Sequence, residues 1–226
     1  MIGDFINLIF PNCCFICDDW LARGEKYICT SCNYHLPRTN GHKHAENDYS
    51  NRLYGRGPFE HVLAYLKFIK KGKTQRLLYH LKYENQPAVG EMLGLWYGND
   101  LKEGGLADAF DLIVPVPLHK SKLRKRGYNQ SDSFAKGLSI ALDVPWESKI
   151  ISRTQKSETQ TRKGRMERWQ NVAHIFKLTD ATAVAGKRIL LVDDVLTTGA
   201  TLEACAMPIL AGECRQISAA VIAVAQ

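Results

Sequence analysis

The strongest chemical signal in the sequence lies at residues 192–201, which read VDDVLTTGAT. Two adjacent carboxylates come first, Asp193 and Asp194, and carboxylates accept hydrogen bonds well from the hydroxyls of a sugar diol. Small or hydroxyl-bearing residues follow them: Thr197, Thr198, Gly199, Ala200 and Thr201. A tight loop of this composition that runs into a helix directs backbone N–H groups at a phosphate. Together these residues predict a ribose-phosphate site, whereas a capped helix after a strand would explain Thr201 but not the paired acids.

A second cluster consists of thiols near the N-terminus. Cys14-x2-Cys17 is followed, after eleven residues, by Cys29-x2-Cys32. Zn²⁺ takes four thiolates in a tetrahedron, and each CxxC turn presents two sulfurs to one ion. We therefore predict a structural zinc finger, with Cys13 as the alternative first ligand. Two disulfides or a redox-active pair are the competing interpretations, although a redox site needs only one CxxC.

Other residues of the same chemistry are expected to have ordinary roles. Three histidines follow the finger and could compete as zinc ligands, but we interpret them as loop residues: His35, His42 and His44. Two further cysteines, Cys205 and Cys214, stand alone and are predicted to be buried or unreactive thiols.

The excess of positive charge is concentrated in two segments. The chain carries a net charge of +7, and five basic residues lie at 120–126 while six more lie between Arg153 and Arg168. One such run is most simply a solvated face. Two runs that flank a predicted phosphate site favour anion binding, either of phosphate esters or of nucleic acid.

Apolar patterns indicate the elements that must position these groups. Leu77, Leu78 and Leu81 recur at helical spacing and predict a helix over 73–83. Further helices are predicted over 87–97, 131–142 and 202–210, and strands within 111–120 and over 188–192 and 217–224. Strands that alternate with helices predict an α/β fold with a parallel sheet flanked by helices. Ligands of such sheets bind beyond the carboxyl ends of the strands, where the acids fall.

The sequence predicts two structured parts. We expect a zinc-finger module of double zinc ribbon-like type at 1–40, a polar connector at 41–57 and the α/β domain at 58–226. No apolar run approaches the roughly 18 residues of a membrane span. The N-terminal stretch is briefly apolar and lacks a positively charged leader, so we expect a cytoplasmic protein.

Two families resemble parts of this pattern. The segment from Val192 to Thr201 resembles the phosphoribosyl pyrophosphate signature of the type I phosphoribosyltransferases. Val114-Pro115-Val116-Pro117-Leu118-His119, with the later Arg126-Gly127-Tyr128-Asn129-Gln130, resembles the ComF family of competence-associated, GntX-like proteins, which also carry an N-terminal zinc finger. The resemblance covers the chain from Cys14 to Val224. It departs from the family at 161–164, where TRKG replaces a more apolar stretch.

The resemblance implies a role for each segment. The acids would contact the ribose 2′ and 3′ hydroxyls, and the threonine–glycine loop would hold the 5′-phosphate. A second loop would hold the diphosphate, with basic residues after it: Val116, Pro117, Leu118, Arg124 and Arg126. A flexible loop between 153 and 171 would close as a lid and include Gln160, Arg168 and Asn171. Mg²⁺ would accompany phosphoribosyl pyrophosphate.

Three functions remain in competition. The first is phosphoribosyl transfer to a nitrogen acceptor, although no residue pattern identifies the acceptor and the motif favours a ligand more strongly than turnover. The second is an accessory protein of DNA uptake and natural transformation that binds single-stranded DNA, with Tyr128 and Trp169 as stacking candidates. The third is an adaptor whose zinc finger docks a protein. We favour a phosphoribosyltransferase-domain protein that contributes to transformation.

Overall fold

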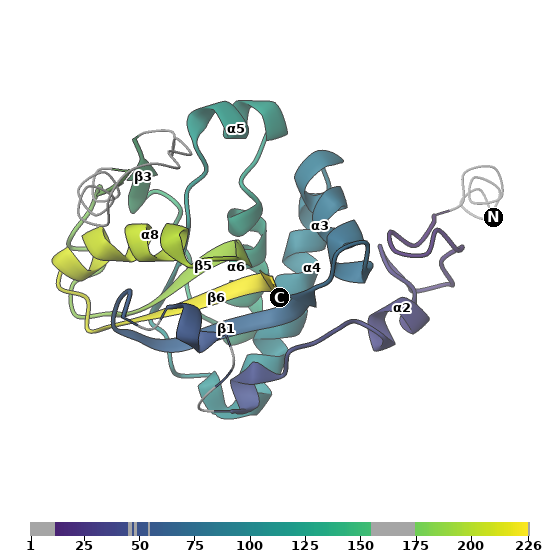
Figure 1. Cartoon of the computed structure of the whole chain (residues 1–226), viewed down its shortest axis with the longest axis horizontal. Helices are drawn as coiled ribbons and strands as arrows, with labels where there is room; N and C mark the ends of the chain where they lie inside the picture. The colour runs from purple at the N-terminus through teal and green to yellow at the C-terminus, as the bar shows by residue number, and fades with distance from the viewer. Residues whose placement is uncertain (1–11, 45–46, 48, 54, 155–174, 226) are drawn as a thin grey trace.

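Four parallel strands form the central sheet of the protein (Figure 1). The computed structural model describes residues 12–44, 47, 49–53, 55–154 and 175–225, and within them the sheet has the order β1-β6-β5-β2. The strands are β1 (Phe59–Phe68), β2 (Leu112–Pro115), β5 (Arg188–Leu196) and β6 (Gln216–Ala225). Long stretches of β5 and β6 are buried without alternation, as expected for strands covered on both faces. The prediction of a parallel α/β sheet is confirmed.

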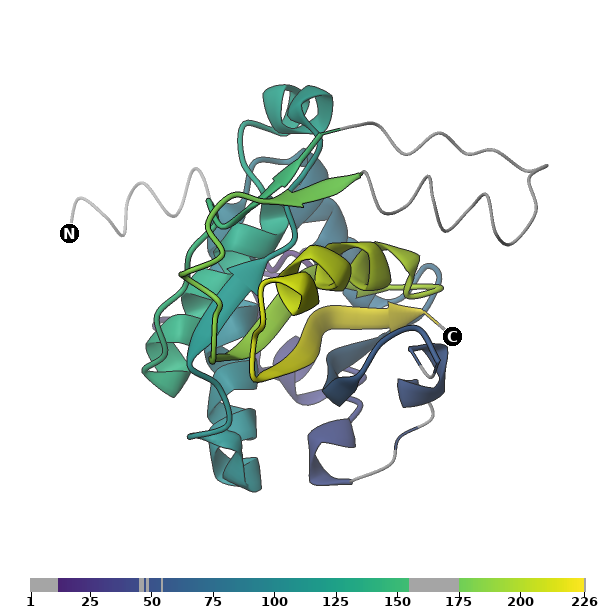
Figure 2. The same ribbon diagram turned by 90° about the vertical axis from the view of Figure 1, so that its left-hand side faces the viewer.

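The two faces of the sheet carry separate cores. Leu63, Tyr65 and Val192 belong to a core that includes buried side chains of three helices: α3 (Lys73–Tyr83), α4 (Pro87–Leu101) and α6 (Gln130–Leu142). Val62 and Leu191 face the opposite core, which the helix α8 (Ala200–Ala211) covers. Figure 2 shows α8 in yellow-green on the near side of the molecule, with the teal helix α5 (Lys120–Arg126) above it.

Most predicted elements are found within a few residues of their predicted bounds. The helix over 73–83 is confirmed without change, and those over 87–97, 131–142 and 202–210 extend to Pro87–Leu101, Gln130–Leu142 and Ala200–Ala211. The strand at 188–192 is longer than predicted and continues to Leu196. Several elements were not predicted, and the two longest of them are the edge strand β1 and the short helix α5 (Lys120–Arg126).

Helices α4 and α6 approach each other closely because glycines face the contact. A Cβ on Gly94 would lie 2.3 Å from the carbonyl oxygen of Phe134, and one on Gly137 would lie 2.1 Å from that of Glu91. Only glycine allows the two backbones to come this near. The contact fixes α6 against α4, and the first turn of α6 contributes to the site described below.

Short elements complete the described part of the chain. They are α2 (Thr30–Tyr34), the 3-10 turns η1 (Gly41–Lys43) and η2 (Ser50–Arg52), the π-helical turn η3 (Lys102–Leu106), and the strands β3 (Ile151–Arg153) and β4 (Phe176–Leu178), which pair antiparallel. Residues 41–57 were predicted as a polar connector, and within them Tyr49 and Leu53 are buried in the core on the α8 side. In the described ranges, no helix has the length and apolar character needed to cross a bilayer.

Candidate functional site

Four cysteines of the N-terminal module converge on one point. The sulfurs of Cys14, Cys17, Cys29 and Cys32 all lie within 4.8 Å of one another. The Sγ atoms of Cys17 and Cys29 are 3.8 Å apart, which matches the separation of about 3.8 Å between two sulfurs of a tetrahedron with Zn–S bonds of about 2.3 Å. This donor set therefore fits Zn²⁺. Among the residues that the structure describes, no other group of three or more His, Cys, Asp or Glu could hold a metal, and Cys13 and the neighbouring histidines lie outside the cluster.

Backbone N–H groups point at the cluster sulfurs. Ile16 and Cys29 donate to Cys14 Sγ at 3.5 Å and 3.3 Å, and Cys32 donates to Cys29 Sγ at 3.4 Å. Burial raises the pKa of the Cys14 thiol, but the N–H donors of Cys17, Cys29 and Ile16 outweigh it and lower the pKa to about 7. At Cys14 these donors favour thiolate, the form that ligates a metal, whereas burial and the neighbouring thiols raise the pKa of Cys32 to about 11.

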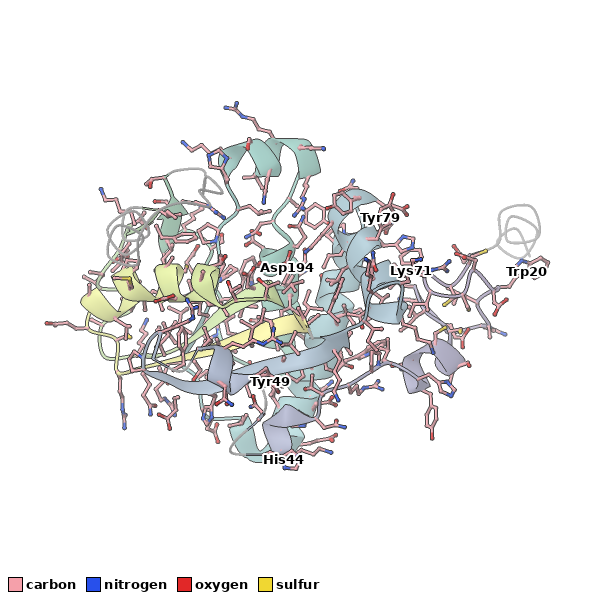
Figure 3. All side chains as sticks on the ribbon, in the orientation of Figure 1. Trp20, His44, Tyr49, Lys71, Tyr79 and Asp194 are labelled. Atoms are coloured by element: carbon pink, nitrogen blue, oxygen red, sulfur yellow. The ribbon has the colours of Figure 1, made fainter. Side chains whose placement is uncertain are left out.

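The module rests on helix α3. The ring of Phe15 stacks on that of His80, with centroids 4.2 Å apart and an interplanar angle of 13°. Arg76 of the same helix pairs with Asp18, with Nη1 and Oδ2 2.8 Å apart, and donates to the carbonyl of Ile16. Figure 3 shows Tyr79 on the flank of α3 and Trp20 at the outer end of the module. Helix α3 is therefore held from outside by the module and from inside by the core.

The paired acids lie in the carboxyl-terminal part of β5. Asp193 is aligned with Val221 of β6, and its Oδ1 accepts a hydrogen bond of 2.8 Å from the N–H of Asp194. Burial and the adjacent charge of Asp194 raise the pKa of Asp193 to about 7, although the Asp194 N–H, Lys82 and the Ser131 hydroxyl act in the opposite direction. The acids thus lie on a central strand between β6 and β2 rather than beyond the strand end that we predicted at Val192.

Two partners of the acids come from distant elements. Lys82, in the last turn of α3, forms an ion pair with Asp194, with Nζ and Oδ2 2.8 Å apart. Ser131, in the first turn of α6, donates from its Oγ to Asp193 Oδ1 at 3.3 Å. Neither residue was among the predicted site residues. Lys82 lies at the end of a predicted helix, where a cation is also explained by the helix dipole, so no local pattern distinguishes it.

The threonine–glycine loop enters helix α8 as predicted, but the helix starts two residues earlier, at Ala200. Gly199 has a φ of +82°, and a Cβ there would lie 2.5 Å from Leu53 Cδ2. Arg52 Nη1 donates to the carbonyl of Thr197 at 2.9 Å. The loop is open to solvent at Thr197, Thr198, Ala200 and Thr201. Residues of the 41–57 segment therefore support a loop whose hydroxyl side is exposed.

The predicted diphosphate segment follows strand β2. Val116 is buried, and its N–H donates to the carbonyl of Val192 at 2.8 Å. Pro117 has no N–H to offer. Leu118 is therefore the first of these three residues whose amide lies outside the pairing of β2 with β5. The strand ends at Pro115, next to Val192 of β5, so this segment leaves the sheet beside the acids.

Residues at and after the end of helix α5 make hydrogen bonds that hold the predicted diphosphate segment and α3 in place. Asn129 Nδ2 donates to the carbonyl of Val116 at 3.1 Å, and the Tyr128 hydroxyl donates to the carbonyl of Leu81. Arg126 donates to Gln130 Oε1 at 2.7 Å and lies over the ring of Tyr83, 5.4 Å from its centroid. Arg124 is exposed on α5. Of the two arginines proposed for the diphosphate, Arg126 is thus engaged within the protein and Arg124 faces solvent.

Four predicted residues fall outside the described part of the chain, and one of them is the stacking candidate Trp169. Gln160, Arg168 and Asn171 of the predicted flexible loop lie between 155 and 174. The segments on either side, β3 and β4, pair with each other, with Ile151 opposite Leu178. The two lone cysteines are placed: Cys205 is buried in α8 and Cys214 is half-buried, as expected.

The acids and the threonine–glycine loop lie in a segment that matches a known domain family. Residues 129–225 match the family model of the phosphoribosyl transferase domain, a range that contains the acids and the threonine–glycine loop. Among solved structures, glutamine phosphoribosylpyrophosphate amidotransferase from B. subtilis, complexed with ADP and GMP, aligns at 18% identity over 63% of this chain and 30% of that chain, with a TM-score of 0.42.

Curated relatives extend the match beyond the domain. Competence protein F of Haemophilus influenzae is 35% identical over 130 residues, which cover 56% of this chain and 57% of that protein. DNA utilization protein YhgH of Escherichia coli K12 is 28% identical over 211 residues, or 86% of this chain and 89% of the relative. Competence protein ComFC of Bacillus subtilis is 36% identical over 95 residues, 42% of this chain and 36% of its own length. With the converging cysteines and the matched domain, these relatives show that the chain belongs to the ComF/YhgH family and carries a phosphoribosyltransferase domain.

Proposed function

We propose that the domain binds phosphoribosyl pyrophosphate together with Mg²⁺ and that this binding serves the use or uptake of DNA in the cytoplasm. The observation that carries the proposal is the position of Asp193 and Asp194 on a central strand, followed at once by the threonine–glycine loop at the N-terminus of the 12-residue helix α8. This arrangement sets diol acceptors beside N–H groups that favour a phosphate. The names of the relatives support the link to DNA.

The chemistry open to such a site is transfer of the phosphoribosyl group to a nitrogen. The bond between C1 and the diphosphate oxygen breaks, the C1–N bond forms, the diphosphate leaves with the electron pair, and the nitrogen releases a proton. The sugar is positioned by Asp193 and Asp194, and its 5′-phosphate by residues 197–201. Mg²⁺ bound with the ligand would offset the diphosphate charge, and it would need few protein ligands because it keeps several waters.

The four-cysteine centre is proposed to hold structural Zn²⁺. Four sulfurs leave no open position for a substrate, and the cluster lies on the outer side of α3. Its proposed role is to fold the module, and through it to fix α3.

Calorimetric titration of phosphoribosyl pyrophosphate with Mg²⁺ tests the proposal. The folded, zinc-loaded wild type is expected to bind, and the Asp193→Ala, Asp194→Ala double variant is expected to lose measurable binding. Absence of binding by the wild type would overturn the proposed ligand. Equal binding by both proteins would show that the ligand lies elsewhere.

Single-stranded DNA binding is the second candidate function, and helix α5 favours it. The helix carries five basic residues in seven, and all positions except Arg126 are exposed. A solvated cationic helix suits the sugar–phosphate backbone of a nucleic acid. Binding through it should weaken with salt, with a slope of roughly 0.7 logarithmic unit per phosphate contacted. Loss of this salt dependence in the Lys122→Ala, Arg124→Ala, Lys125→Ala variant would support the assignment, and an unchanged slope would exclude it.

A further inference from the structure

The ion pair between Lys82 and Asp194 joins the proposed ligand site to a helix outside the matched domain. The atoms are 2.8 Å apart, and the two side chains are only 19% and 20% exposed. Lys82 is also 112 residues away from Asp194 in the chain. A partly buried pair of this kind is more strongly held than one on the surface, because solvent screens it less.

Helix α3 holds Lys82 in place from several sides. Its neighbour Leu81 is fully buried, and the carbonyl of Leu81 accepts from the Tyr128 hydroxyl. Tyr83 lies beneath the guanidinium of Arg126. On the outer side, His80 stacks on Phe15 of the four-cysteine module. Lys82 is therefore set by contacts to the core, the segment after α5 and the module.

The charges at the site explain why a cation is needed there. Two adjacent carboxylates repel each other, and they also repel a sugar phosphate that approaches them. Asp193 avoids part of this repulsion because burial and the charge of Asp194 raise its pKa to about 7. Asp194 is paired instead, and Lys82 offsets its charge while leaving its second oxygen as an acceptor. A lysine ammonium has three N–H donors, of which the pair with Asp194 uses one.

We propose that Lys82 is a positioning residue of the ribose-phosphate site, which orients Asp194 toward the sugar diol and offsets its charge. This inference rests on the proposed function, because it assumes that the acids receive the ribose. Lys82 acts through Asp194 and not through the diphosphate. Ligands that contain the ribose ring should therefore depend on Lys82, and ligands that lack it should not.

Three probes titrated into the full, zinc-loaded chain test this inference: phosphoribosyl pyrophosphate with Mg²⁺, ribose 5-phosphate, and inorganic pyrophosphate with Mg²⁺. Lys82→Met keeps the length of the side chain without its charge. We expect it to weaken the two ribose ligands by about 10- to 100-fold, the usual effect of losing a hydrogen bond to a charged group. Pyrophosphate binding should stay within about twofold, and Lys82→Arg should restore most of the ribose affinity.

A matched control is available in a second ion pair. Lys136 Nζ of α6 and Glu91 Oε2 of α4 are also 2.8 Å apart, but both side chains are exposed and neither belongs to the site. Lys136→Met should leave all three affinities unchanged. Thermal unfolding of each variant checks the fold, and Lys82→Gln replaces Lys82→Met if the latter does not fold.

Each outcome separates this inference from the proposed function. If the wild type binds no ribose ligand, the proposed function fails, and Lys82 has no site to position. If the wild type binds and Lys82→Met binds equally well, only the role of Lys82 is overturned. If Lys82→Met weakens pyrophosphate as much as ribose 5-phosphate, Lys82 contacts the diphosphate directly, which also overturns a positioning role through Asp194.

Discussion

The four-cysteine module and the proposed ribose-phosphate site differ in how their residues are held in place. Within residues 12–40 the buried apolar side chains are Cys14, Ile16, Ile28, Cys32 and Leu36, and two of these are cysteines of the cluster. The acids instead lie on a strand between two cores, which contain buried side chains of the sheet and the surrounding helices. These five side chains pack onto the core on the α3 side, and we expect a segment with so few buried side chains of its own to depend on the proposed metal to fold, whereas the acids lie within the main sheet.

Removal of the metal should have the largest effect, and it should be confined to the module. The Cys17→Ser, Cys29→Ser variant is expected to lose the structural ion, whose binding contributes on the order of 10 kcal/mol to folding in small zinc modules. Hydrogen exchange should then show loss of protection in residues 12–36 and retained protection in β5 and β6. Cys214→Ser, outside the cluster, is the control. If residues 12–36 kept their protection from hydrogen exchange without metal, the module would not differ from the sheet in its dependence on a ligand.

On the sheet, neutralising Asp193 should change the free energy of unfolding by an amount that depends on pH. Its pKa is raised to about 7 in the folded state, so the folded protein binds this proton more tightly than the unfolded chain. The resulting stabilisation is complete below about pH 4, where both states are protonated, and is lost as the pH rises to about 7. Asp193→Asn should therefore exceed the wild type in free energy of unfolding at pH 8 by about 2–4 kcal/mol, and equal it near pH 4.

Urea unfolding at several pH values between 4 and 8 measures this difference. Asp111→Asn is the control of opposite sign, because the hydrogen bonds from Arg188 lower the pKa of Asp111 to about 2. The Asp111 carboxylate stabilises the protein above about pH 4 and loses this effect as the pH falls toward 2, so its variant should be the less stable one at pH 8. If the difference in free energy of unfolding between Asp193→Asn and the wild type did not change with pH, burial would not raise the pKa of Asp193.

A pair of glycines provides the smallest and most local test of the two regions. Gly199 in the proposed phosphate loop and Gly24 in the module both have positive φ, +82° and +92°. A Cβ on Gly199 meets Leu53, whereas one on Gly24 has no atom within 4 Å. Gly24→Ala should cost about 1 kcal/mol from backbone strain alone. Gly199→Ala should cost about 1–3 kcal/mol and also weaken 5′-phosphate binding. If the two variants lost the same free energy of unfolding, the loop at residue 199 would adjust around Leu53 without a measurable cost.

The accuracy of the sequence predictions follows from how local each signal is. The helix over 73–83 is confirmed because Leu77, Leu78 and Leu81 mark one face at helical spacing. Strand β1 was missed because its central run, Val62 to Leu66, is apolar throughout, and such a run is compatible with a strand or a buried helix. Only the pairing of β1 with β6, more than 150 residues later in the chain, determines which of these forms.

The sequence by itself determined the four cysteines, the acid pair and the threonine–glycine loop, because each is a set of neighbouring residues with fixed spacing. Only the tertiary structure decided what surrounds them. Lys82 reaches Asp194, Ser131 reaches Asp193, and Leu53 supports Gly199 because helices and loops far apart in the chain pack on the same edge of one sheet. Such contacts depend on how elements pack and not on the spacing of residues, so no motif contains them.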